Sequence, residues 1–122
     1  THTYRLERLA EGAGGRTWFG EGCSLTWKPD RELELSPLYG NVLVKCLPRR
    51  ELIPVLRRQK GRLQTAGLLC RPEEREELTA LLARAGATRI TRAGEMSRTF
   101  PGEAHDGEYS LRRYIRLADI ET

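Results

Sequence analysis

The residues best suited to acid–base chemistry in this sequence are His105 and Asp106, in the short run AHDG. An imidazole titrates near neutral pH, so a loop histidine beside an aspartate can orient a substrate or transfer a proton. A second reading stays open, in which Asp106 caps a following helix and His105 packs locally at the surface. Glu103 and Arg98 lie on the same loop and are further candidates to line such a site.

Thiol chemistry is the second possibility, because the sequence has three cysteines, Cys23, Cys46 and Cys70. An odd number without a close pair argues against a disulfide framework and against a zinc site, so we expect no metal centre. Each cysteine lies beside apolar residues in a predicted strand, which predicts burial. Cys23 precedes Ser24 as in a Cys-Ser nucleophile, but its place in an alternating strand argues against that role. A reduced, cytoplasmic setting follows as an expectation.

Basic side chains gather between residues 49 and 62 of a chain with a net charge of +4. The members are Arg49, Arg50, Arg57, Arg58, Lys60 and Arg62. No aromatic residue is interleaved with them, which disfavours nucleic-acid binding. The cluster is either a solvated surface or a site for an anionic ligand, such as a phosphate of CoA or of a dinucleotide.

The elements that must position these residues alternate between strand and helix. Apolar runs predict strands near 42–47, 63–70 and 88–91, joined by two helices. The first helix is expected to start near Glu51, which leaves Pro54 in its first turn, and the second to stop at Gly86. Such an order predicts an α/β fold, a βαβαβ parallel sheet with flanking helices.

Shorter segments surround this unit. Residues 18–28 alternate, with Cys23, Leu25 and Trp27 expected on one face of a half-buried strand, and residues 31–35 form a second alternating piece. A loop over 93–107 leads to a last helix over 108–117. The predicted inward residues of that helix are Leu111, Tyr114 and Ile115. Residues 4–10 suggest the end of a helix, and residues 118–122 a terminal strand.

Two segments carry a resemblance to known reductases. The run SPLYGNVLV resembles the Glu-x-Phe-Gly-Pro-Val segment of the aldehyde dehydrogenase superfamily. Together, SPLYGNVLVK and AHDGEYSLRRYI are similar to the C-terminal part of the long-chain acyl-CoA reductases of bacterial bioluminescence operons, over roughly Gly15 to Thr122. The resemblance implies the C-terminal half of an aldehyde-dehydrogenase-like catalytic domain. Residues 1–122 would then be a single α/β domain or a fragment of a larger reductase.

The same resemblance implies a reaction in which a fatty acyl thioester is reduced to an aldehyde with NADPH. The family's nucleophilic cysteine lies upstream of the matching region, so most of the catalytic and cofactor machinery would lie outside this chain. Tyr39 takes the position of the aromatic residue that packs near the nicotinamide. Pro37 stands where the family has the glutamate that holds the ribose. The His105 loop is expected beside the C-terminal ends of the parallel strands.

Partners follow from the same comparison. The tail of superfamily members pairs with another subunit, which implies a homo-oligomer, and acyl-CoA or another acyl thioester is the implied substrate. No apolar run approaches the roughly 20 residues needed to cross a bilayer, so we expect no membrane association. The alternative function is a non-catalytic α/β module that binds a phosphate-bearing ligand through the basic residues 49–62.

Overall fold

The structure is a computed structural model that describes residues 14–35, 38–116 and 118–120. The chain divides into two compact units, Thr1–Glu51 and Leu52–Thr122, and each is described by itself. The expected helix end at residues 4–10 lies outside the described residues.

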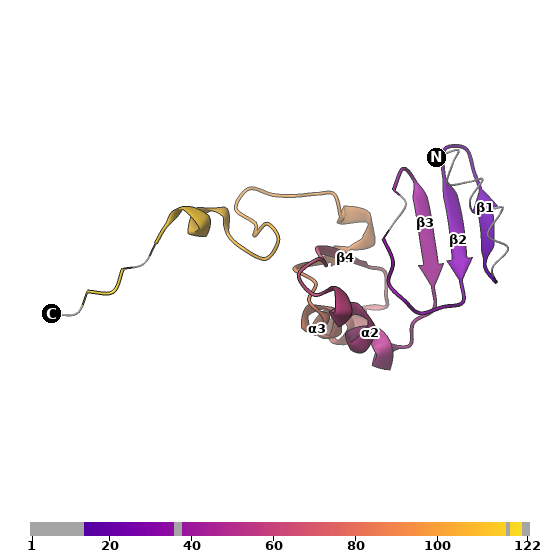
Figure 1. Cartoon of the computed structure of the whole chain (residues 1–122), viewed down its shortest axis with the longest axis horizontal. Coiled ribbons are helices and arrows are strands. Elements are labelled where there is room, and N and C mark those ends of the chain that lie inside the picture. The colour runs from indigo at the N-terminus through magenta and orange to yellow at the C-terminus, as the bar shows by residue number, and fades with distance from the viewer. Residues whose placement is uncertain (1–13, 36–37, 117, 121–122) are drawn as a thin grey trace. The chain divides into compact units, whose positions relative to one another are not determined.

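The first unit is a three-stranded sheet in the order β1-β2-β3 (Figure 1). Its strands are β1 (Arg16–Phe19), β2 (Ser24–Lys28) and β3 (Asn41–Lys45). β1 and β2 are antiparallel, whereas β2 and β3 are parallel. The prediction of one continuous strand over 18–28 was wrong, because Gly20 and Gly22 make a hairpin there, with Gly20 N donating to Cys23 O at 3.0 Å.

The buried face of β2 carries polar side chains. Ser24 and Thr26 are each 3% exposed, while Leu25 is 41% exposed. Both buried side chains have hydrogen-bond partners within the sheet: Thr26 Oγ1 lies 3.1 Å from Thr17 Oγ1, and Ser24 bonds to Asn41. Paired hydroxyls can be buried at little cost, so alternation alone did not identify the inner face.

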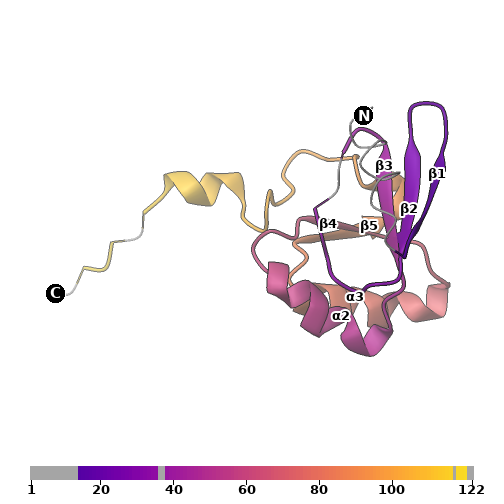
Figure 2. The ribbon, with the colours of Figure 1, turned by 45° about the vertical axis from the view of Figure 1, so that its right-hand side comes forward.

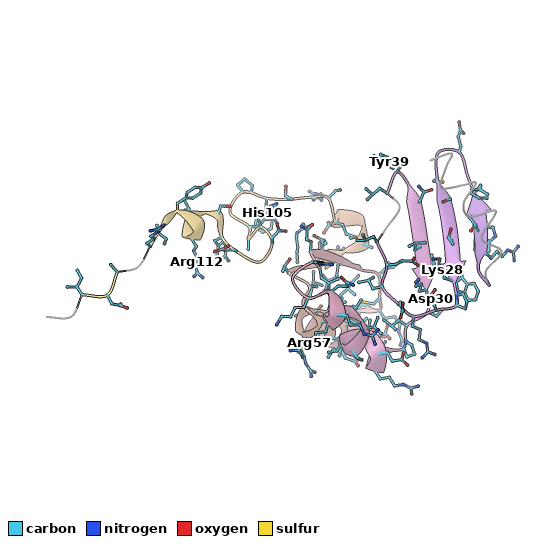
Figure 3. The ribbon with its side chains drawn as sticks, viewed as in Figure 1. Lys28, Asp30, Tyr39, Arg57, His105 and Arg112 are labelled. Atoms are coloured by element: carbon cyan, nitrogen blue, oxygen red, sulfur yellow. The ribbon has the colours of Figure 1, made fainter. Side chains whose placement is uncertain are left out.

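A charged cluster lies at the C-terminal ends of β2 and β3. Its members are Lys28, Asp30, Glu34 and Lys45. Lys28 and Lys45 are directly opposite each other in the parallel register. Lys45 Nζ lies 2.5 Å from Asp30 Oδ1 and 2.8 Å from Glu34 Oε1, and Lys28 Nζ lies 2.9 Å from the same Glu34 oxygen. Figure 3 labels Lys28 and Asp30. These contacts tie residues 30–34 across the strand ends, and the second alternating piece predicted at 31–35 is not a strand.

The charged cluster predicts an acid-sensitive stability. The Lys45 ammonium holds the pKa of Asp30 below its ordinary 3.8, and Lys45 and Lys28 hold that of Glu34 below its ordinary 4.5. Depressed carboxyl pKa values stabilise the fold above the unfolded-state pKa, and this contribution is lost as pH falls through the folded-state values. We therefore expect the urea concentration at the unfolding midpoint to decrease as the pH is lowered past about 4.5. This decrease with pH should be less steep in Lys45→Met. Equal slopes in the two proteins would contradict this assignment.

The second unit is built on a parallel strand pair, β4 (Thr65–Leu68) and β5 (Arg89–Arg92). The connection between them is a short 3-10 turn, η2 (Pro72–Glu74), followed by α3 (Arg75–Ala85). Gly86 ends α3 in the left-handed conformation, with φ +111°, as the sequence predicted. α3 and the part of α2 from Leu52 onward lie on one side of the strand pair (Figure 2).

The first predicted helix differs in its bounds. α2 spans Arg49–Leu56, which puts Pro54 inside the helix and not in its first turn. Proline has no N–H to continue the hydrogen-bond ladder, and the chain tightens after Leu56 into the 3-10 turn η1 (Arg57–Gln59).

The mixed α/β class is confirmed, but the single βαβαβ sheet is not what the described residues form. β3 pairs with β2 in one sheet, and β4 pairs with β5 in another. The second half of the prediction, a βαβ unit from β4 through α3 to β5, is present.

The C-terminal segment also departs from the prediction. The long loop contains one 3-10 turn, η3 (Ala93–Glu95), and the expected helix over 108–117 is reduced to the 3-10 turn η4 (Ser110–Tyr114). Leu111 and Tyr114 are 79% and 85% exposed, so the prediction that they face inward was wrong. One 3-10 turn is too short to bury a stripe of side chains. Residues 118–120 are not a strand, and 121–122 lie outside the described residues.

Candidate functional site

The turn before β3 presents Tyr39. Leu38, Tyr39 and Gly40 all have left-handed backbone angles, with φ of 61°, 51° and 76°. This conformation costs roughly 1–2 kcal/mol for each residue with a Cβ atom, so surrounding contacts must hold it. Tyr39 is 76% exposed at the tip of the turn (Figure 3). Its ring face is therefore available to pack against a planar ligand.

Asn41 supplies the contacts that hold this turn. Its side-chain Nδ2 and its backbone N both donate to Leu38 O, at 2.7 and 3.0 Å. Its Oδ1 accepts from Ser24 Oγ at 2.7 Å, and the Asn41 side chain is buried. A Cβ on Gly40 would come within 2.9 Å of Gly22 O, so this position requires glycine. Asn41 was not among the residues predicted to have a functional role, although a polar residue at the start of an apolar strand is a signal that could have indicated it.

His105 and Asp106 lie in a two-residue hairpin turn. His105 N donates to Glu108 O at 2.9 Å, and Glu108 N donates back to His105 O at 3.1 Å. Both central residues have positive φ, +54° at Asp106 and +84° at Gly107, which is the mark of a type I′ turn. The Asp-Gly pair is the sequence signal for this turn. The predicted capping role of Asp106 was wrong, because Tyr109 precedes the 3-10 turn η4.

The hairpin turn brings the two candidate catalytic side chains together. His105 Nδ1 lies 3.1 Å from Asp106 Oδ2, and the imidazole is exposed (Figure 3). Adjacent residues seldom point the same way, and the left-handed backbone at Asp106 is what allows it here. With Nδ1 facing the carboxylate, Nε2 remains available to hold or transfer a proton.

The His105 turn does not lie where the sequence analysis placed it. A Cβ built on Gly107 would lie 3.1 Å from Thr88 Cγ2, so the turn packs beside Thr88. Thr88 immediately precedes β5, and its N and Oγ1 both donate to Gln64 O ahead of β4. The turn therefore lies at the N-terminal end of the strand pair, and not at the C-terminal ends.

Arg89 holds the loop that leads to this turn. Its guanidinium donates to Met96 O at 2.7 Å and to Arg98 O, and its Nε lies 3.4 Å from Glu103 Oε2. A groove of about 360 Å³ lies between β5 and the loop, lined by Arg89, Thr91, Glu95, Arg98, Thr99 and Phe100. Of the loop residues named from sequence, Arg98 lines this groove, and Glu103 is engaged with Arg89.

The cysteines are less buried than predicted. Cys23 and Cys46 are exposed and Cys70 is partly exposed, because each lies just outside a strand and not within one. None of the three is joined in a disulfide bond. Within the described residues no cluster of three or more His, Cys, Asp or Glu side chains could hold a metal ion.

The basic cluster of residues 49–62 spans the boundary between the two units. Arg57 and Arg58 lie on η1 with exposed side chains (Figure 3). Neither of them lines the groove beside β5. Among the helices of the described residues, none is long and apolar enough to cross a membrane.

These features define a mixed α/β protein with two notable turns. One presents Tyr39 and is held by hydrogen bonds from Asn41, and the other is a hairpin turn that carries the His105–Asp106 pair. The comparison with known families is specific: the model of the family described as Acyl-CoA reductase (LuxC) matches residues 5–117. This chain belongs to the acyl-CoA reductase (LuxC) family, which implies an oxidoreductase acting on acyl substrates. Searches among curated proteins and among solved structures return no match.

Proposed function

We propose that this chain is the C-terminal part of an acyl-CoA reductase that reduces a fatty acyl thioester to an aldehyde with NADPH. The observation that carries the proposal is the family match over residues 5–117. The nucleophilic cysteine and most of the cofactor site would be supplied by segments outside this chain. Alone, these 122 residues should have no reductase activity.

The exposed ring of Tyr39 fits the cofactor that the family implies. Asn41 holds the left-handed turn, so the backbone that presents Tyr39 is fixed ahead of any ligand. An exposed aromatic face suits packing against a nicotinamide. Pro37, which lies outside the described residues, has no side-chain acceptor for a ribose hydroxyl. NADPH, when bound, supplies the hydride that converts the acyl thioester into an aldehyde.

His105 has the chemistry to assist the thioester exchange. A cysteine thiolate from outside this chain would attack the carbonyl carbon, and the bond from that carbon to the CoA sulfur would break. CoA then leaves as a thiolate, and His105 Nε2 would give it a proton. Asp106, whose Oδ2 lies 3.1 Å from Nδ1, would orient the imidazole.

The test is an assay of acyl-CoA-dependent NADPH oxidation by the purified full-length protein. His105→Asn should lower kcat about 100-fold, with a smaller change in KM, because a proton donor acts mainly in the transition state. Asp106→Asn should lower kcat less, since it removes only the orienting charge. Unchanged pH profiles and kcat in both variants would show that the pair is structural.

The cysteines provide the matched control. The triple variant Cys23→Ser, Cys46→Ser, Cys70→Ser should keep its activity and should still be labelled by a radioactive acyl-CoA. Loss of acyl labelling in this variant would place the nucleophile in this chain and would overturn the proposed division of the active site.

We further propose that the protein is a cytoplasmic homo-oligomer. The proposal of an oligomer is supported by exposed apolar side chains in the C-terminal segment. They are Leu111, Tyr114, Ile115 and Ile120. Large apolar side chains grouped in a short segment favour contact with another protein surface. The resemblance to a superfamily whose tail joins another subunit points the same way.

A further inference from the structure

A second groove lies at the C-terminal ends of the parallel strands. Leu68 and Arg92 are the last residues of β4 and β5 and are opposite each other in the register. Both line a groove of about 420 Å³ that also includes Leu69, Pro72, Arg75 and Gly94. In open α/β sheets, ligands bind in the crevice outside the carboxyl ends of the strands. The volume falls within the range of ordinary small-molecule sites.

The lining of this groove carries two positive charges and no acidic side chain. The structure shows carboxylate partners for other arginines of this unit: Arg71 lies 3.1 Å from Glu74, and Arg98 lies 3.6 Å from Glu95. Within the part of the chain that the structure describes, Arg75 and Arg92 have no such ion pair. The groove therefore has two guanidinium groups in its lining that no ion pair with a described carboxylate neutralises.

Two guanidinium groups at one groove are suited to a phosphate. Arginine presents a planar fork of donors that matches phosphate oxygens, and charge-assisted hydrogen bonds of this kind are stronger than neutral ones. Arg75 is also the first residue of α3, where the helix dipole adds a favourable field for an anion. Leu68, Leu69 and Pro72 provide an apolar wall for the uncharged part of the same ligand.

We propose that Arg75 and Arg92 bind a phosphate group of a ligand seated in this groove. CoA thioesters and NADPH, the two substrates of the proposed reductase, both carry suitable phosphates. The inference rests on the proposed function only in naming these two ligands as sources of the phosphate. The site is separate from the basic cluster of residues 49–62, since neither Arg57 nor Arg58 lines the groove.

Isothermal titration calorimetry of the full-length protein tests the proposal, with CoA, NADPH and inorganic pyrophosphate as probes. In Arg75→Gln, Arg92→Gln the dissociation constant of at least one probe should rise by about tenfold or more, since two charge-assisted contacts are lost. The control variant Arg57→Gln, Arg58→Gln removes the same amount of charge from η1. It should change the dissociation constant of each probe by less than about threefold. Thermal melting checks that both variants remain folded.

The source of the phosphate is identified by paired ligands. A site for the CoA 3′-phosphate should lose the preference for CoA over dephospho-CoA in the arginine double variant. A site for the NADPH 2′-phosphate should lose the preference for NADPH over NADH. Binding of pyrophosphate alone, dependent on both arginines, would support this site while contradicting the proposed reductase function. No binding of any probe, or equal losses in both double variants, would overturn the inference.

Discussion

Asn41→Ala is expected to lower the free energy of unfolding by about 2–4 kcal/mol. The substitution removes the hydrogen bond from Nδ2 to Leu38 O and leaves the buried Ser24 hydroxyl without its acceptor. It also releases the turn in which Leu38 and Tyr39 are held with left-handed angles. Denaturant unfolding measures the first effect. If Tyr39 packs against the nicotinamide, the KM for NADPH should rise in the same variant.

The neighbouring Val42 gives the control for this prediction. Val42 is exposed in the same strand, so Val42→Ala should cost less than about 1 kcal/mol. A second comparison is Gly40→Ala, where the added Cβ would meet Gly22 O, and which should also disturb the turn. Equal stability of Asn41→Ala and the unsubstituted protein would show that the buried amide does not hold the Tyr39 turn.

Arg89→Met should destabilise the second unit by about 2 kcal/mol and loosen the loop that leads to His105. The methionine keeps much of the apolar stem but loses the bonds to Met96 O and Arg98 O. It also leaves the Glu103 carboxylate, 17% exposed, without its partner. Hydrogen exchange should become faster in the amides of residues 95–103, and reductase activity should fall because His105 is held less well.

Two further variants separate this contact from general charge effects. Arg98→Met removes an exposed charge paired at 3.6 Å with Glu95 and should cost less than about 1 kcal/mol. Glu103→Gln added to Arg89→Met should recover part of the loss, because the unpartnered charge is then absent. Additive losses in that double variant would mean that Glu103 and Arg89 do not interact.

Local chemistry in the sequence was enough to predict several elements. Gly86 stops α3 because glycine adopts the left-handed angle without a Cβ clash. β3, β4 and β5 lie within about two residues of their predicted starts, since short apolar runs between turn signals are typical of strands. The His105–Asp106 pair was named from residue types alone, although the turn that joins them was not recognised.

The sequence by itself therefore determined the α/β class, the family and the residues with candidate chemistry, because these depend on residue type and on neighbours a few positions apart. Only the tertiary structure decided which strands pair, which face of β2 is buried and where the His105 turn lies. Each of these depends on contacts between segments distant in the chain, such as Ser24 with Asn41 and Gly107 with Thr88. The local pattern does not encode such pairings, because many partners could satisfy the same strand edge or hydroxyl group.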